Sequence, residues 1–297
     1  MAPSQELNAV LEMIRTRSAE TQKTTDDDRL SYERIMSTLP MDDDIETERV
    51  GANGVPAEWI RAPESQDHRV VLYLHGGGYL FGSARTHRVM LAHMARAAKA
   101  RVLALDYRLA PEIPFPAPVE DSVSAYRWLL SQGIAPEKMV IGGDSAGGGL
   151  TVAALVALRH VGEPMPAAGV CISPWADMEA TGQSYTDNAE ADPSVSKERI
   201  QKIAGVYMGG KDPKAPLASP IHADLTGLPP LLLQVGSIEV LLDDSTMLKS
   251  RAKEAGVSVE MEVWDDMPHV WHHYAPILPE ARKAIGRIGE FVLQHTG

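Results

Sequence analysis

Short runs rich in valine, isoleucine and leucine recur along the chain without alternating polar residues. Continuous apolar runs of this length are typical of strands buried on both faces of a parallel sheet. We predict strands at 69–74, 101–106, 138–143, 168–173 and 230–236, and a further strand at 258–264.

Segments with apolar residues at helical spacing lie between these runs. We predict helices at 86–100, 118–133 and 146–160, and a closing helix at 279–295. Strands and helices that alternate along a chain indicate an α/β fold, in which helices cover a mostly parallel sheet.

Two regions, 1–45 and 179–215, fall outside this alternation. The first begins with apolar residues at helical spacing, and the second is polar with prolines and glycines around KERIQKIAGVYMGG. Because long insertions into an α/β core are often functional, we predict that both form a small helical cap on a catalytic domain, 46–297. The alternative role of the two regions is to cover the core, and the two roles are compatible. The apolar positions at spacing i, i+3, i+4 and i+7 are Leu7, Val10, Leu11 and Ile14.

The composition is that of a soluble globular protein, with 297 residues, 44% of them hydrophobic and 23% charged. This length predicts one large domain or one domain with a small lid. The net charge of −12 makes nucleic acid and anionic membranes poor partners. The chain shows neither a secretory signal nor a stretch apolar enough to span a bilayer, so we expect a cytoplasmic protein without membrane insertion.

A G-x-S-x-G pattern, from Gly143 to Gly147, follows one predicted strand and opens a predicted helix. In this context the serine of the pattern is a nucleophile held on a very tight turn, where only glycines fit two residues before and after it. The turn also brings the N–H of Ala146 to a helix N-terminus, which favours an oxyanion. A glycine-rich phosphate turn is the alternative, but neither a P-loop lysine nor G-x-G-x-x-G accompanies it.

A second serine motif, S-x-x-K, occurs at 194–197. The K-T-G motif that accompanies it in penicillin-binding enzymes is absent from the sequence, which disfavours this alternative nucleophile.

Three consecutive glycines follow His75, directly after the predicted strand 69–74. They allow backbone N–H groups to converge on one point, so the loop is a candidate oxyanion hole together with Ala146. The alternative is a bare tight turn. We expect His75 to hold the loop by hydrogen bonds rather than to take part in catalysis.

Serine hydrolases on this kind of fold carry their residues in the order serine, acid, histidine. His269 comes just after the last predicted strand. Loops that follow parallel strands lie at the same edge of the sheet, so a histidine in this loop can reach the serine. His272 and His273 lie further on, in the turn that follows the loop. We therefore predict His269 as the general base.

Three carboxylates follow the predicted strand 230–236: Glu239, Asp243 and Asp244. Glu239 lies in the loop just beyond the strand, where an acid reaches the histidine. The two aspartates suit the N-cap and first turn of the next helix. We favour Glu239 as the acid and keep Asp243, then Asp244, as alternatives, since Ser-His-Glu triads exist.

Several motifs together resemble the bacterial hormone-sensitive-lipase-like family of α/β-hydrolase esterases, in its GDSAG branch. The resemblance implies an eight-stranded, mostly parallel sheet with helices on both faces. It also implies a cap made by the N-terminal helices and an insertion after the sixth strand. The motifs are HGGGY, DYRLAPE (106–112), GGDSAGGGL, ISPWADM (172–178) and MPHVWH.

By this resemblance, the oxyanion donors are the N–H groups of Gly77, Gly78 and Ala146. It implies no metal or organic cofactor, and homodimers are common among similar enzymes. The acid position of the family, usually an aspartate, is Glu239 here, and a second family aspartate aligns with Asp243.

We therefore predict a serine carboxylesterase that hydrolyses short-chain acyl esters through Ser145, His269 and Glu239. Alternatives on the same machinery are a lactone hydrolase, an amidase or a peptidase. A non-catalytic small-molecule receptor is a further alternative, disfavoured because the serine and the base are retained. The preference for short chains follows from the small cap that the resemblance implies.

Four residues are candidates for the substrate pocket. Tyr79 follows the glycines, Asp144 precedes the nucleophile, and Tyr185 and Tyr207 belong to the predicted cap insertion. For the tyrosines, ordinary packing is an equal alternative.

Overall fold

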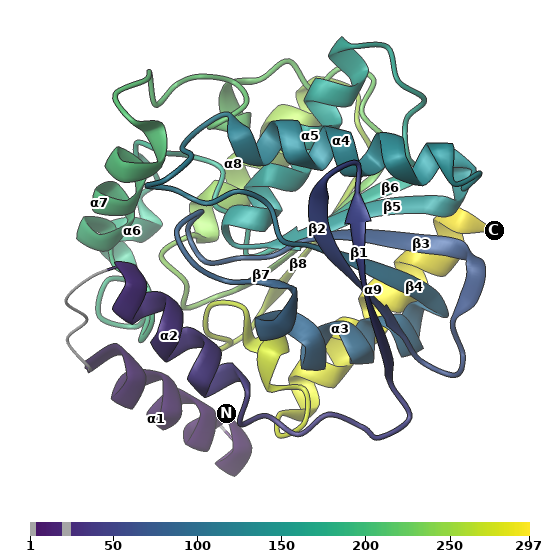
Figure 1. The fold of residues 1–297 in the computed structure, drawn as a ribbon. Coiled ribbons are helices and arrows are strands. Elements are labelled where there is room, and N and C mark those ends of the chain that lie inside the picture. The colour runs from purple at the N-terminus through teal and green to yellow at the C-terminus, as the bar shows by residue number, and fades with distance from the viewer. Residues whose placement is uncertain (1–3, 20–24) are drawn as a thin grey trace.

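The computed structural model describes residues 4–19 and 25–297, which form a twisted sheet flanked by helices (Figure 1). The strand order is β1-β2-β4-β3-β5-β6-β7-β8; β1 and β2 run antiparallel to their neighbours, and the other pairs are parallel. The predicted eight-stranded, mostly parallel sheet is confirmed. The strands are β1 (Glu46–Ala52), β2 (Val55–Arg61), β3 (Gln66–Leu74), β4 (Ala100–Leu105), β5 (Met139–Asp144), β6 (Ala168–Ile172), β7 (Leu231–Gly236) and β8 (Val259–Trp264).

The first two strands have no counterpart among the runs found in the sequence. β1 is largely exposed and polar, so it lacks the apolar run of a buried strand. The available signal was the pair Asn53-Gly54, whose positive φ angles of 52° and 87° form the tight turn between the two strands.

Helices cover both faces of the sheet (Figure 1). Successive residues of a strand point to opposite faces, and both faces are buried. Val71 and Tyr73 belong to one apolar core, whereas Leu72 and Leu74 belong to the other. This explains why the strands appear in the sequence as continuous apolar runs. The helices are α3 (Ala84–Ala98) and α9 (Pro279–Thr296) on one face, and α4 (Ala117–Ser131), α5 (Ala146–His160) and α8 (Leu242–Glu254) on the other.

The helix predicted at 86–100 begins and ends two residues earlier than expected. Ser83 caps its N-terminus by accepting a hydrogen bond from the Thr86 N–H. At the other end Lys99 takes a left-handed conformation with φ of 47°, which frees Ala100 to begin β4.

Four further helices lie together on one side of the molecule (Figure 1). Two come from the N-terminal region and two from the insertion after β6. The four apolar residues at helical spacing in the first of them are all buried. The limits predicted for the cap and the catalytic domain stay a prediction, although β1 begins at Glu46. These helices are α1 (Gln5–Ala19), α2 (Thr25–Met36), α6 (Ser184–Asp187) and α7 (Lys197–Met208).

Arg29 of α2 anchors this group of helices to loops of the catalytic domain. Its guanidinium forms two hydrogen bonds of 2.8 Å to the Glu112 carboxylate. It also donates to the carbonyl oxygens of Leu80 and Ala110, at 2.8 and 3.0 Å. Helix α2 is thereby fixed beside the loop that carries the three glycines. In the part of the chain that the structure describes, no helix has the length and apolar character needed to cross a membrane.

Candidate active site

Ser145 lies on the turn between β5 and α5 with a positive φ of 54°. The turn leaves no space for side chains beside it. A Cβ on Gly143 would overlap the carbonyl oxygens of Gly147 and Leu74, and a Cβ on Gly147 would overlap that of Leu74. The two glycines of the motif are therefore required by close backbone packing, as predicted from the pattern.

Ser145, His269 and Glu239 form a chain of hydrogen bonds. The Nε2 atom of His269 lies 2.9 Å from Ser145 Oγ, and its Nδ1 atom lies 2.7 Å from Glu239 Oε2. Glu239 follows β7 and His269 follows β8, so both side chains come from loops at the edge of the sheet where Ser145 emerges. The structure brings the three predicted residues together, in an arrangement that can activate a hydroxyl group.

The environment of His269 favours its protonated form. Burial alone would lower the pKa of the imidazole, but the hydrogen bond and the negative charge of Glu239 outweigh it, and the pKa of His269 is raised. Asp192 and Asp144 add to this effect. The site therefore stabilises the imidazolium that forms when this histidine accepts a proton.

The glycine loop, Ser145 and His269 all line one cavity. Gly77 and Gly78 have φ angles of 113° and 61°, which favour glycine and allow the loop to bend against the nucleophile turn. The cavity is lined by Ile14, Tyr32, Met36, Gly77, Gly78, Phe81, Asp144, Ser145, Trp175, Ser194, Val195, Arg199, Ile200, Ile203, His269, Val270, His273 and Tyr274.

His75 has the structural role expected of it. Its ring stacks on Tyr107 with centroids 4.2 Å apart, and its Nδ1 lies 2.7 Å from the Gly76 carbonyl oxygen. The Tyr107 hydroxyl donates to the His75 carbonyl oxygen at 2.6 Å. These contacts fix the start of the glycine loop.

The pocket predictions for the three tyrosines are wrong, whereas Asp144 does line the cavity. Among the described residues around the cavity, Tyr79, Tyr185 and Tyr207 are absent. Tyr79 and Tyr207 stack flat on each other with centroids 3.7 Å apart, and all three tyrosines are at least 98% buried. All three rings belong to the same hydrophobic core, so their side chains are used in packing.

Known proteins resemble this chain over its whole length. A family model described as the alpha/beta hydrolase fold matches residues 71–273. The solved structure of an esterase from the bacterial hormone-sensitive lipase (HSL) family is 67% identical, covers 100% of both chains and has a TM-score of 0.99. The chain belongs to this family. The resemblance drawn from the motifs is thus confirmed.

Two further relatives of this HSL-family protein are close in sequence. An acetyl-hydrolase of Streptomyces hygroscopicus is 47% identical over 99% of this chain and 98% of its own. The structure of EstE5 that was soaked by p-nitrophenyl butyrate is 49% identical, covers 99% of both chains and has a TM-score of 0.95.

Neither aspartate after Glu239 is the N-cap of helix α8 in this HSL-family protein, so the N-cap prediction is wrong, whereas the first-turn prediction is confirmed. The N-cap is Leu241, and both aspartates lie in the first turn. Asp243 accepts a hydrogen bond of 2.8 Å from the N–H of Ser184 in α6. Asp244 accepts from the N–H groups of Ala176 and Asp177, at 2.8 and 2.9 Å. Their carboxylates reach across to the segment after β6, because its amides are buried and need acceptors.

We expect Asp244→Asn to raise stability at pH 8. Burial raises the pKa of Asp244 to about 8, and the charge of nearby Asp177 adds to this, against the two amide hydrogen bonds. The folded state thus retains a proton that the unfolded chain releases near pH 4, so stability falls as pH rises from about 4 to about 8. Asparagine keeps an acceptor without the buried charge, which should gain roughly 2–5 kcal/mol at pH 8.

Thermal unfolding at pH 5 and pH 8 measures this effect. Asp243→Asn, at a half-buried neighbouring position, is the matched control and should not flatten the pH dependence. An unchanged pH dependence in Asp244→Asn would contradict the prediction.

Ser173 is a site residue that our sequence analysis missed. It follows β6 directly, and its Oγ donates to Glu239 Oε1 at 2.7 Å while accepting from the Val270 N–H at 3.2 Å. The Gly236 N–H donates to the same Glu239 oxygen, at 2.6 Å. Ser173 therefore joins the acid to the loop that carries His269. A polar residue at the carboxyl end of a buried strand was the available signal.

We expect Ser173→Ala to lower kcat about tenfold or more with little change in KM. The change removes a hydrogen bond to a buried carboxylate, which typically contributes about 1.5–3 kcal/mol. Steady-state kinetics on a p-nitrophenyl ester measures the effect. Ser122→Ala removes another fully buried hydroxyl, in α4, and should leave kcat unchanged. Equal kcat values in the two variants would mean that Ser173 does not position the acid.

Proposed function

We propose that this protein is a serine carboxylesterase that hydrolyses short-chain acyl esters. The proposal rests above all on the two short hydrogen bonds that join Glu239, His269 and Ser145. The names of its relatives, an acetyl-hydrolase and an esterase of the same family, support it.

In the proposed reaction, Ser145 Oγ attacks the ester carbonyl while His269 Nε2 takes its proton. Glu239 holds the Nδ1–H tautomer and stabilises the imidazolium. The N–H groups of Gly77, Gly78 and Ala146 would donate to the oxyanion. His269 then protonates the leaving alcohol, and a water molecule activated by the same ring hydrolyses the acyl-enzyme.

The walls of the cavity support small substrates. Ile200 and Ile203 of α7 line it together with Ile14 and Met36 of the N-terminal helices. A relative soaked by p-nitrophenyl butyrate has the same fold at a TM-score of 0.95. We therefore propose that acyl chains of acetate to butyrate size are preferred.

Two measurements test the function. An organophosphate should phosphorylate Ser145 in a one-to-one ratio, with complete loss of activity; activity that survived full labelling would refute the mechanism. A series of p-nitrophenyl esters from acetate to palmitate should show its highest kcat/KM at the short end. A maximum at palmitate would overturn the chain-length proposal, and a panel of lactones and amides separates the alternative substrates.

We also propose that the protein forms a homodimer through its last strand. β8 stands at the end of the strand order, and its Val263 is 47% exposed. An exposed edge strand is a template for pairing with a second strand. Light scattering should give twice the chain mass of 32.2 kDa. A mass of one chain at high protein concentration would refute this proposal.

A further inference from the structure

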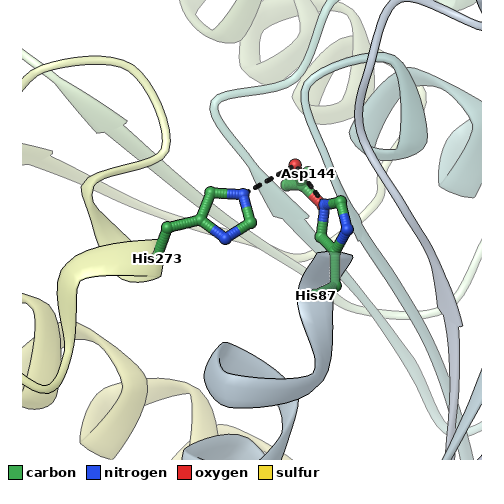
Figure 2. A group of neighbouring side chains, drawn as sticks. All are labelled: His87, Asp144 and His273. Carbon is green, nitrogen blue, oxygen red and sulfur yellow. Dashed lines mark hydrogen bonds and ion pairs between the residues drawn. The ribbon is translucent and has the colours of Figure 1, made fainter. Parts of the chain in front are cut away.

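Three side chains with metal-binding atoms converge beside the nucleophile turn (Figure 2). His87 comes from α3, Asp144 ends β5, and His273 lies in the short helix η3 (Trp271–Tyr274). The Nε2 atom of His87 lies 3.2 and 3.3 Å from the two oxygens of Asp144, and that of His273 lies 4.0 Å from Oδ2. One ligand atom from each residue lies within 4.8 Å of the other two.

Neighbouring groups hold His87 and Asp144 in this orientation. Asp144 Oδ1 accepts hydrogen bonds from the Tyr73 hydroxyl and the Gly76 N–H, at 2.9 and 3.0 Å. His87 Nδ1 lies 3.1 Å from the Ser83 carbonyl oxygen. Metal-binding histidines usually make such a hydrogen bond through their other ring nitrogen, and metal-binding carboxylates are held in a similar way.

His87 Nδ1 also lies 2.8 Å from the Thr86 hydroxyl, which can donate or accept, so either tautomer of the ring fits its contacts. The side chains of His87 and Asp144 are 0% and 2% exposed. The Gly76 N–H lies 3.3 Å from His87 Nε2 and also donates to Asp144 Oδ1. When Nε2 carries no proton, its lone pair and the Asp144 carboxylate are two acceptors that face each other in a buried site, and such a pair favours a positive charge between them.

We propose that His87, Asp144 and His273 bind a first-row divalent metal ion, with Zn²⁺ as the probe, and that the bound ion inhibits hydrolysis reversibly. Two imidazole nitrogens and one carboxylate oxygen suit Zn²⁺, Co²⁺ or Ni²⁺, whereas Ca²⁺ and Mg²⁺ prefer oxygen ligands. Tetrahedral Zn²⁺ separates its ligand atoms by about 3.3 Å. To reach this spacing, His273 must turn its Nε2 atom from the Tyr32 hydroxyl, 3.2 Å away, toward Asp144.

The ion can enter through the substrate cavity, because Asp144 and His273 both line it. The fourth coordination position then faces the cavity and takes water. Asp144 is one of the acidic groups that stabilise the protonated form of His269. A divalent charge beside it opposes the imidazolium that forms during hydrolysis, which gives the expected inhibition.

Metal binding is tested on the full chain after treatment with a chelator. Zn²⁺ is titrated in competition with a chromophoric chelator, and Co²⁺ is titrated while its visible absorption is recorded. We expect one equivalent per chain and Co²⁺ bands of low coordination number. His87→Gln and His273→Gln should each weaken binding at least about tenfold. The matched control is His222→Gln in a second, partly exposed group with Asp177 and Glu179, which should leave this affinity unchanged.

Inhibition is measured on the same variants, each relative to its own metal-free rate. Zn²⁺ should inhibit the native protein and His222→Gln alike, EDTA should restore the rate, and His87→Gln should require at least about tenfold more Zn²⁺. Equal binding in the native protein and both ligand variants, or no binding at all, would overturn the site. Equal inhibition of His87→Gln would place the inhibitory ion elsewhere, for instance at His269. The binding titration does not depend on the proposed esterase activity, so the two proposals fail separately.

Discussion

Ser145→Ala should lower kcat on p-nitrophenyl acetate by about 10⁶. Loss of the nucleophile of a serine hydrolase removes covalent catalysis, and only the contribution of the oxyanion donors and of substrate binding is left. The side chain lies within hydrogen-bond distance of His269 Nε2, in the cavity rather than in the core, so the change should leave folding intact. Steady-state kinetics and thermal unfolding of the same preparation measure both effects.

Ser194→Ala is the matched control for this result. Ser194 lines the same cavity, but its hydroxyl donates to Asp192 rather than to a histidine. We expect kcat of this variant to stay within a few-fold of the native value. Loss of activity in Ser194→Ala together with a normal rate in Ser145→Ala would exchange the two serines and contradict the proposed nucleophile.

Glu239→Gln should lower kcat by about 10⁴. The amide keeps the size of the side chain, but its NH₂ group can face the Nδ1 of His269 and favour the wrong tautomer, as in other serine hydrolases whose acid is replaced by its amide. Glu239→Ala should lose about 10³–10⁴. It also leaves the hydroxyl of Ser173 and the N–H of Gly236 without their acceptor, so its stability must be measured as well.

The pH profile separates this role from simple destabilisation. In the native protein Glu239 raises the pKa of His269, and a protonated histidine cannot act as the base. The rate therefore falls as pH decreases through this raised pKa. In Glu239→Gln the acidic limb of kcat/KM should move to lower pH, because the negative charge is gone.

Asp243→Asn is the control for the choice of acid, since the sequence analysis kept Asp243 as the alternative acid of the triad. Its carboxylate contacts Ser184 in α6, so the change should affect the attachment of the cap rather than the reaction. A loss of kcat in Asp243→Asn as large as that in Glu239→Gln would contradict the assignment of the acid.

Residues that depend on local backbone could be predicted from the sequence. The nucleophile turn is set by five consecutive residues between a strand and a helix, and its two glycines are required by contacts within that turn and the adjacent β3. The histidine was found from its place after the last strand. The acid was selected because Glu239 lies nearest the end of β7, and the structure adds the 2.7 Å distance to His269.

Residues that depend on contacts between distant segments could not be predicted in this way. Ser173 lies 66 residues from Glu239 in the sequence. The tyrosines near the glycine loop and in the insertion were placed in the pocket by proximity to motifs, but their rings are buried in the core. Motif spacing says nothing about which way such side chains turn.

The sequence by itself determined the class of fold, the order of the buried strands and their helices, and the nucleophile, acid and base at the carboxyl edge of the sheet, because these follow from local periodicity and turn chemistry. The tertiary structure alone decided which side chains meet at that edge. It joined His87, Asp144 and His273, with the first two 57 residues apart along the chain. Such meetings depend on how α3, β5 and η3 pack around the sheet, and the side-chain distances that result are not encoded in any single segment.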